Sequence, residues 1–390
     1  MGPGSVAGRP LALRGAPVTP FLTAEIARRC AARRAAGLPV IGMHFGQPSD
    51  GPGAASLAAV RRSLDGPDPG YWESRPLRAR LARHYRERYG VTIAEERILL
   101  TAGASAGLVG VFATAFAPGD RVAIVCPGYP AYRSALRAMH LIPEELRVEA
   151  AAGYHLDAGR LAACNPAPQG LLLASPANPT GTVTGSPALQ ALLSVCRERS
   201  IRFISDEIYH GLGYAADEHS ALEYDDDVFV VGSFSKFFRM PGWRLGWLIV
   251  PQGIASTVHD CLINLFLTPP TPTQHAALAA LEAPGEFLPS IERYARNRAR
   301  LLSGLRALGV TAHEPDGAFY IYADFSRYTR DSLRFCLRAV DETGVGMAPG
   351  VDFDPQGGAS FVRLCFAIGE EAVNAALDRL AGWLPGYRDD

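Results

Sequence analysis

The sequence predicts an α/β fold, in which a mostly parallel sheet carries helices on both faces, together with a smaller α+β domain. From about residue 76 to 365, helical patterns alternate with short apolar runs that are rich in β-branched residues. Such runs are typical of strands that are buried on both faces of a sheet. The length of 390 residues and the hydrophobic content of 48% are also sufficient to bury more than one core.

The first expected helix ends at Gly90, because glycine often caps a helix at its C-terminus. Its apolar stripe consists of Leu77, Leu81, Tyr85 and Tyr89. A second stripe at helical spacing runs from 189 to 196, and both stripes are expected to face the core. The expected strands are "RVAIVC" (121–126), "GLLLAS" (170–175), "IRFISDE" (201–207), "VFVVGSF" (228–234) and the returning "GWLIVP" (246–251).

The last third of the chain predicts the smaller domain. A helical region rich in Arg and Leu (about 286–308) leads to "GAFYIYADF" (317–325), another helix and "FVRLCFA" (361–367). Strands and helices in this order indicate an α+β unit. No internal repeat or long linker precedes it, so we expect the two parts to follow each other directly.

Composition and charge exclude several classes of function. The net charge is −1 and neither sign forms a long block, so the chain lacks the basic patch that binds nucleic acid or an anionic membrane. The seven cysteines are scattered without a C-x-x-C motif, which argues against a disulfide framework and a structural zinc site. There is no apolar run of about 18 residues and no signal peptide, so we expect a cytoplasmic protein whose partners are small molecules.

One residue stands out chemically. Lys236, in "VGSFSKFFRMPGWRLGW" (231–247), is the only lysine among 38 basic residues. A desolvated lysine amine can act as a nucleophile, whereas a guanidinium cannot. The alternative is a surface lysine that survived in an arginine-biased composition, and the neighbouring segments must decide between the two.

Four other segments place polar residues at the ends of predicted strands, where an α/β sheet binds its ligand. The Ala104–Ser105 turn in "LLTAGASAG" suits an anion at a helix N-terminus. Tyr129 in "CPGYPAY" and Asn178 in "ASPANPTG" each also have an ordinary structural explanation, as a buried aromatic and a turn residue. Asp206 in "FISDEIYHG" ends an apolar strand, and a carboxylate buried there needs a positive partner, for which an arginine ion pair is the alternative.

Taken together and in this order, the segments resemble the class I/II aminotransferases of fold type I, the aspartate aminotransferase-like superfamily, which use pyridoxal 5'-phosphate. The resemblance runs from "FGQP" (45–48) to "FVRLCFA" (361–367), and its core is "ASPANPTG…SDEIY…SFSKFFRMPGWRLGW". It implies an N-terminal arm and part of the small domain over 1–45, a large pyridoxal-phosphate-binding domain over 46–280 and a C-terminal small domain over 281–390.

The resemblance also implies the roles of the cofactor-ring residues. Lys236 would hold the cofactor aldehyde as a Schiff base and then move the substrate Cα proton as a free amine. Asp206 would keep the pyridine nitrogen protonated, which supplies the positive partner that a buried carboxylate needs. Asn178 and Tyr209 would hydrogen-bond the phenolic oxygen of the cofactor, and Tyr129 would stack on its ring.

The resemblance further assigns the phosphate and the substrate. The phosphate would be held by the Ala104–Ser105 turn, Ser233, Ser235 and Arg244. Tyr71 would reach the phosphate of a neighbouring subunit, which implies a homodimer with shared active sites. Arg363 would bind the α-carboxylate of the substrate, with Gly46 and Asn178 close to the same group. No metal site is expected.

Two segments depart from the family pattern. "YWESRPLR" (71–78) reaches its Leu-Arg pair about three residues early and without the usual glycine, so the loop near the substrate must differ. The aspartate-using branch tends to have a lysine just inside the phosphate turn, where this chain has Ser105. A preference for dicarboxylate substrates is therefore not indicated by that residue.

The function that the sequence predicts is a pyridoxal-phosphate-dependent aminotransferase of amino acid metabolism or biosynthesis. A lyase or cyclase on the same scaffold, which eliminates, replaces or closes a ring, is the main alternative because a motif does not report how the substrate is oriented. "SFSK" also matches the S-x-x-K motif of serine acylases, but that class needs a second lysine. A non-catalytic regulator would need a DNA-binding segment, for which the short N-terminal stretch has no room.

Overall fold

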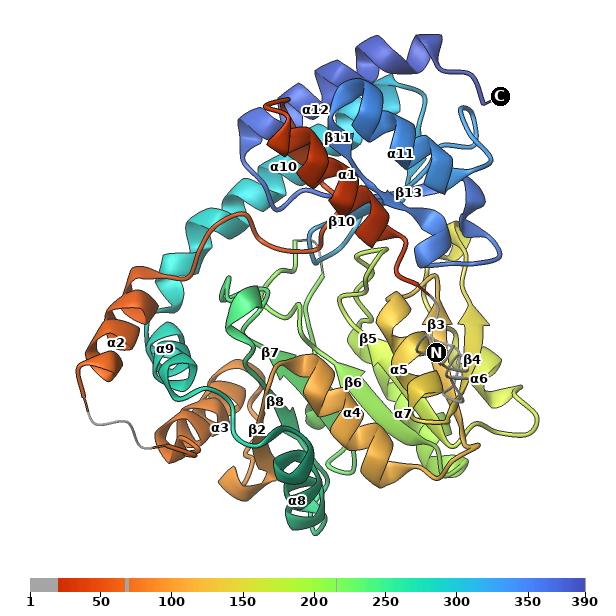
Figure 1. Cartoon of the computed structure of the whole chain (residues 1–390). Coiled ribbons are helices and arrows are strands. Elements are labelled where there is room, and N and C mark those ends of the chain that lie inside the picture. The colour runs from red at the N-terminus through yellow and green to blue at the C-terminus, as the bar shows by residue number, and fades with distance from the viewer. Residues whose placement is uncertain (1–19, 67–69, 215, 390) are drawn as a thin grey trace, which may run out of the picture.

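The structure is a computed structural model that describes residues 20–66, 70–214 and 216–389. A large α/β body is built around one seven-stranded sheet, and a smaller part with a second sheet lies above it in the view of Figure 1. The predicted α/β fold with an additional smaller α+β part is confirmed.

The large sheet is parallel except for one strand. Its order is β2-β8-β7-β6-β5-β3-β4, and only β8 runs antiparallel to its neighbours, β2 and β7. This strand is the predicted return after Lys236. The strands are β2 Ile98–Thr101, β3 Arg121–Cys126, β4 Ile142–Arg147, β5 Gly170–Ala174, β6 Arg202–Asp206, β7 Phe229–Ser233 and β8 Gly246–Ile249.

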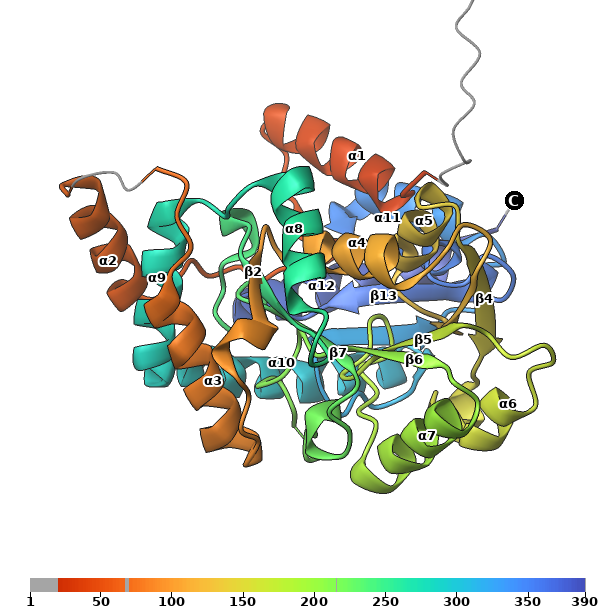
Figure 2. The same ribbon diagram turned by 90° about the horizontal axis from the view of Figure 1, so that it is seen from below.

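Helices cover both faces of this sheet. Figure 2 shows α4, α5 and α8 on one face and α6 and α7 on the other. Alternate residues of each strand point to opposite faces, so Leu99 packs in the core beneath α4 while Leu100 packs in the core on the other side. The helices of the body are α2 Ala54–Leu64, α3 Arg75–Tyr89, α4 Ala104–Ala115, α5 Pro130–Ala138, α6 Ala158–Ala162, α7 Ser186–Glu198, α8 Ala255–Phe266 and α9 Thr271–Glu282.

The predicted helix that ends at Gly90 is α3, and both of its ends follow from local chemistry. Ser74 precedes the helix and its hydroxyl accepts a hydrogen bond from the Leu77 amide (3.1 Å). Gly90 has a φ of 70°, a left-handed conformation that glycine adopts without strain. The residues of the predicted stripe pack into the core of the body.

The smaller part is built around a four-stranded antiparallel sheet with the order β12-β13-β10-β9. Its strands are β9 Thr311–Ala312, β10 Tyr320–Asp324, β12 Ala348–Pro349 and β13 Phe361–Cys365, and a separate parallel pair joins β1 Ile41–Gly42 to β11 Val345–Gly346. Its helices are α1 Thr23–Ala35, α10 Leu288–Ala307, α11 Ser332–Thr343 and α12 Glu370–Trp383.

The N-terminal helix α1 packs with this C-terminal part, as Figure 1 shows from the red and blue ribbons at the top. Asp352 accepts hydrogen bonds from the Leu22 amide (2.8 Å), the Thr23 amide (2.8 Å) and the Thr23 hydroxyl (2.6 Å). Donors at the start of a helix are thereby satisfied by a carboxylate from a distant segment. The domain boundaries drawn from the sequence stay a prediction.

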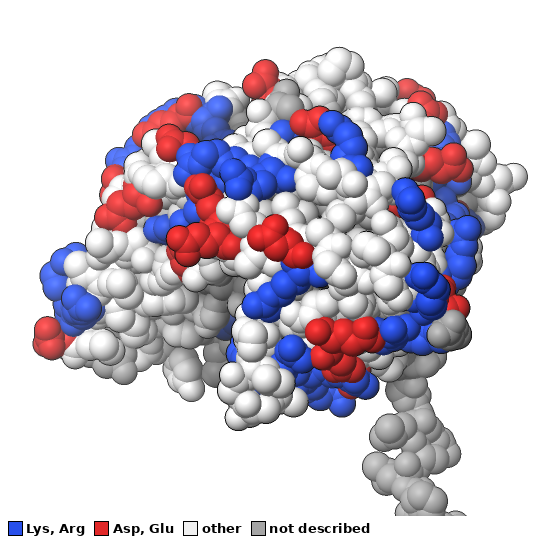
Figure 3. Space-filling model, turned by 90° about the horizontal axis from the view of Figure 1, so that it is seen from above, with Lys and Arg blue, Asp and Glu red and all other residues white. Residues whose placement is uncertain are grey.

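Acidic and basic side chains alternate on the face seen from above in Figure 3. Ion pairs of the smaller part follow the same pattern, for example Arg296 with Glu370 (2.7 Å) and Arg338 with Glu342 (2.7 Å). Exposed pairs of this kind contribute little to stability. In the part of the chain that the structure describes, no helix is both long enough and apolar enough to span a bilayer.

Candidate active site

The site lies where the parallel strands of the large sheet end. Asp206 is the last residue of β6, Ser233 is the last residue of β7, and Tyr129 follows β3. Since parallel strands end on the same edge of a sheet, these side chains meet over one cavity of about 350 Å³. The cavity is lined by every predicted site residue except Tyr71: Gly46, Ala104, Ser105, Tyr129, Asn178, Asp206, Tyr209, Ser233, Ser235, Lys236, Arg244 and Arg363.

Lys236 and Asp206 form the charged floor of this cavity. The Lys236 amine donates a hydrogen bond to the Gly46 carbonyl (2.7 Å), and burial lowers the pKa of Lys236 to about 8. Burial likewise raises the pKa of the Asp206 carboxyl to about 6, although it accepts hydrogen bonds from the Tyr132 hydroxyl (2.5 Å) and the Ile208 amide (3.2 Å). The pKa shifts of both groups thus favour their neutral forms. A cationic ring nitrogen beside Asp206 would lower the pKa of its carboxyl again and favour the ionised form.

An anion cradle lies at the N-terminus of α4. Gly103 precedes the helix with a φ of 83°, and a Cβ built there would lie 2.4 Å from Nη2 of Arg244. No side chain caps the first turn of α4, so the helix end presents backbone amides toward Arg244. Ser233 and Ser235 add hydroxyls to the same cavity. A helix N-terminus, hydroxyls and a guanidinium together fit a phosphate dianion.

Arg363 forms the second cationic end of the cavity. Its guanidinium is buried, donates to Oδ1 of Asn178 (2.9 Å) and to the His44 carbonyl (2.6 Å), and lies over the rings of Tyr320 and Phe353. Among the described residues, its hydrogen-bond acceptors are an amide oxygen and a carbonyl, and its Nε has no hydrogen-bond partner. A buried guanidinium without an anionic partner is suited to a carboxylate supplied by a ligand.

Two tyrosines of the site were missed by the sequence reasoning. Tyr132 donates to Asp206, and the Tyr320 hydroxyl lies 2.7 Å from the Tyr209 hydroxyl. Tyr132 follows Tyr129 by three residues at the start of α5, a spacing that could have placed both on one face of a helix. No sequence pattern around Tyr320 indicates a site residue. Its position explains why residue 46 is a glycine, because a Cβ at Gly46 would lie 2.0 Å from the Tyr320 hydroxyl oxygen.

Tyr71 is the one predicted site residue that lies away from the cavity. Its side chain is 80% exposed in the single chain. Tyr71 is therefore accessible on the surface of the single chain, as the predicted contact with a neighbouring subunit requires. The roles of Tyr71 and of the cavity residues stay predictions.

Comparisons with known proteins agree with this geometry. The family described as "Aminotransferase class I and II" matches residues 42–380. A valine–pyruvate aminotransferase of Mycobacterium tuberculosis is 40% identical over 384 residues, which cover 96% of this chain and 98% of the relative. An aspartate/prephenate aminotransferase of Thermus thermophilus is 31% identical over 385 residues, with 96% and 98% covered.

Solved structures give the same result. The crystal structure of an aminotransferase from Mycobacterium tuberculosis has a TM-score of 0.94 at 39% identity and covers 97% of this chain and 100% of that one. The aspartate aminotransferase of Thermus thermophilus with maleate has a TM-score of 0.87 at 30% identity, with 94% and 97% covered. Both similarities extend over nearly the whole chain.

The lowered pKa of Lys236 predicts how cofactor uptake depends on pH. Only a neutral amine attacks an aldehyde, and burial lowers this pKa from 10.5 to about 8. If Lys236 takes up pyridoxal phosphate, as the sequence predicts, the rate of uptake should rise with pH to about 8 and then level off, as followed by stopped-flow absorbance. A rate that keeps rising to about 10.5 would show that the amine is not desolvated.

Proposed function

The chain belongs to the class I and II aminotransferases, and on that premise we propose that it moves an amino group between an α-amino acid with an uncharged side chain and a 2-keto acid, with pyridoxal phosphate bound at Lys236. The aminotransferases among its relatives do not favour a lyase or cyclase. The observation that carries the proposal is one cavity lined by a lysine amine, a buried carboxylate and two guanidinium groups.

The residues of the cavity fit pyridoxal phosphate, which the family uses. The cradle formed by the α4 N-terminus, Ser233, Ser235 and Arg244 would hold its phosphate. The buried Asp206 carboxylate would face its ring nitrogen, and the Tyr129 ring would stack on it. Oδ1 of Asn178 is engaged by Arg363, which leaves the Asn178 amide free to donate, together with the Tyr209 hydroxyl, to the phenolic oxygen.

The mechanism assigns each proton to a residue of this chain. When bound, pyridoxal phosphate supplies a ring that accepts the electron pair left at the substrate Cα after deprotonation. Lys236 would hold the cofactor, and its amine, once the substrate amine has displaced it, would take the Cα proton. Asp206 would hold a proton on the ring nitrogen. Arg363 binds the α-carboxylate and orients Cα toward Lys236.

The cavity also supports a substrate class. Its cations in the described residues are Lys236, Arg244 and Arg363, each of which has a partner in this mechanism. None is left for a second carboxylate, whereas Phe21 and Phe45 offer apolar surface at the same cavity. We therefore propose an apolar amino donor such as valine and a small acceptor such as pyruvate, the pair in the name of the Mycobacterium tuberculosis relative.

A homodimer is part of the proposal. The exposed Tyr71 follows Gly70, whose carbonyl accepts a hydrogen bond from the Thr271 hydroxyl (3.3 Å). The nearby end of α8 exposes Leu265 and Leu267, with 54% and 52% of their surface accessible. A second chain that covers these apolar side chains would bring Tyr71 to the phosphate of its neighbour.

A cytoplasmic location is also proposed. All seven cysteines are free thiols, and five of them are buried. A chain without disulfides suits a reducing compartment.

Arg363→Ala should lower kcat/KM for all amino acid substrates by a similar factor. The α-carboxylate contact is common to them, and its loss from a desolvated site costs roughly 2 to 4 kcal/mol, which is a fall in kcat/KM of about 30- to 1,000-fold. Arg244→Ala is the matched control, which should instead raise the dissociation constant of pyridoxal phosphate. Unchanged kcat/KM in the Arg363 variant would place the carboxylate elsewhere.

A single-turnover experiment tests the reaction and the substrate class. Valine should convert the bound cofactor of the holoenzyme to its pyridoxamine form, and pyruvate should restore the original absorbance. Aspartate should react more slowly, because its second carboxylate has no cation to meet. Release of ammonia while the cofactor stays an aldehyde would contradict the transamination, and faster reaction with aspartate would contradict the substrate class.

A further inference from the structure

A second cavity lies behind the active site. It has a volume of about 160 Å³ and lies between α3, the ends of β6 and β7, the residues after Lys236 and the end of α9. Ser233 and Ile208 line both cavities, so a single layer of side chains separates them. The volume corresponds to about five water molecules at ~30 Å³ each, which is room for a small organic ligand.

A half-satisfied carboxylate forms the base of this cavity. Glu207 is only 5% exposed, and its Oε1 accepts hydrogen bonds from the Ser205 hydroxyl (2.9 Å), the Ser220 hydroxyl (3.0 Å) and the Ala221 amide (3.0 Å). Its Oε2 has no hydrogen-bond partner among the described residues. Three donors converge on one oxygen, which leaves the other oxygen open to a positive group that would favour the ionised form of the carboxyl.

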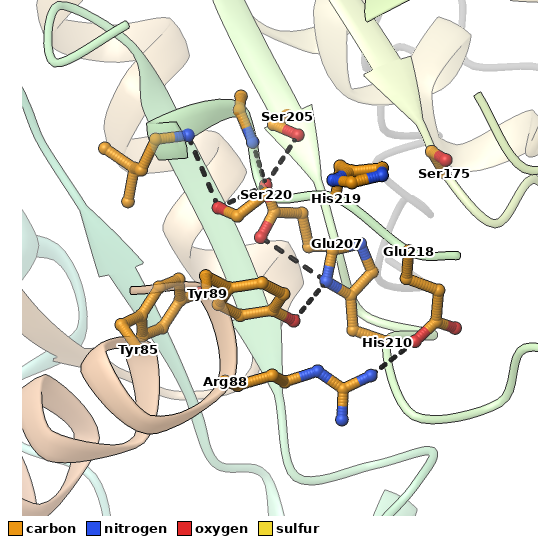
Figure 4. A network of polar contacts seen from close by, with 12 residues as sticks. Tyr85, Arg88, Tyr89, Ser175, Ser205, Glu207, His210, Glu218, His219 and Ser220 are labelled. Carbon is orange, nitrogen blue, oxygen red and sulfur yellow. Dashed lines mark hydrogen bonds and ion pairs between the residues drawn. The ribbon is translucent and has the colours of Figure 1, made fainter. Parts of the chain in front are cut away.

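The imidazole beside Glu207 is not that positive group. Nδ1 of His210 lies 3.6 Å from Oε2 of Glu207 and 2.5 Å from the Tyr89 hydroxyl, as Figure 4 shows. Burial and the nearby Arg88 lower the pKa of His210 to about 3, so the imidazole is neutral, and its Nδ1 is hydrogen-bonded to the Tyr89 hydroxyl. Glu207 therefore has no cationic partner within its own network.

The two guanidinium groups of the cavity already have partners of their own. Arg88 donates to Oε2 of Glu218 (2.6 Å). Arg80 lies 3.0 Å from Glu282 and 3.4 Å from Glu87 and donates to the Leu281 carbonyl (2.7 Å). These acidic groups balance both arginines, so an ionised Glu207 adds one negative charge that nothing around the cavity compensates.

The remaining walls are mostly aromatic. Five aromatic side chains line the cavity, Tyr85, Tyr89, Phe237, Phe238 and Trp247, together with His84 and the aliphatic Ile208, Leu281 and Pro284. Ring faces attract cations, and a cage of aromatic rings is how proteins bind methylated ammonium groups. We propose that this second cavity binds a small methylated or quaternary ammonium group, with Glu207 as its counter-ion and the aromatic side chains as its cage.

Calorimetric titration of the holoenzyme with tetramethylammonium chloride tests this site. The probe has no N–H group, so it cannot react with the cofactor aldehyde. We expect saturable binding of one cation per chain, and no saturable binding of sodium chloride, sodium acetate or tert-butanol, which is neutral and of similar shape. Absence of tetramethylammonium binding, or equal binding of tert-butanol or acetate, would overturn the proposal.

Two variants locate the binding. Glu207→Gln keeps an oxygen for the three donors but removes the charge, so affinity for tetramethylammonium should fall at least tenfold. Glu144→Gln is the matched control, because this partly buried carboxylate pairs with Arg121 and does not line the cavity. The affinity of the control variant for tetramethylammonium should stay within about twofold of that of the unmodified enzyme. An equal loss of affinity in both variants, or no loss in either, would refute the assignment to Glu207.

A pH series on the unmodified enzyme tests the same claim without a variant. The titratable and charged groups around Glu207 and its cavity lie on three segments. They are His210 on its own segment, Arg80, His84, Tyr85, Glu87, Arg88 and Tyr89 on α3, and Glu218, His219 and Glu223 beyond β6. Burial raises the pKa of Glu207 to about 8, and only its ionised form attracts a cation. Affinity should therefore fall roughly tenfold per pH unit below about 8, and a flat profile would contradict the proposal.

Discussion

The desolvation of one amine and one carboxylate at the same sheet edge is the constraint on which the active site depends. Asp206 ends β6 and Lys236 follows the neighbouring parallel strand β7, and the two strands pair from Ile204 with Phe229 to Asp206 with Val231. This pairing brings both groups to one cavity, where burial shifts each pKa toward the neutral form. Shifted pKa values of this kind cluster at functional sites, where a ligand supplies the opposite charges.

Much of this arrangement could be predicted from the sequence, because it follows from local rules. The alternation of apolar runs and helical stripes determines the parallel sheet, and a parallel sheet places the residues after its strands on one edge. These rules place Asp206, Asn178 and Tyr129 at strand ends, and the resemblance to the aminotransferase family then assigns them to one site. Lys236 could be singled out because lysine occurs only once in the chain.

The remainder depends on contacts between distant segments, for which the sequence offers no local pattern. The hydrogen bond between Tyr209 and Tyr320 joins residues 111 positions apart, and the bond from Arg363 to His44 spans 319. The separate position of Glu207 could not be predicted from the sequence for a different reason. Beside Asp206 in "SDEIY" it reads as part of the same motif, and only the structure shows that its side chain turns away into a second, aromatic cavity.

The central claim is that Lys236 carries the cofactor, and reductive labelling tests it most directly. Borohydride reduction of the holoenzyme should fix the mass of pyridoxal phosphate on one peptide only, the one that contains "VGSFSK". Because the chain has no other lysine, the N-terminal amine is the only competing site. Mass spectrometry should thus find the label on Lys236, whereas label on the N-terminus, or on no peptide, would contradict the account.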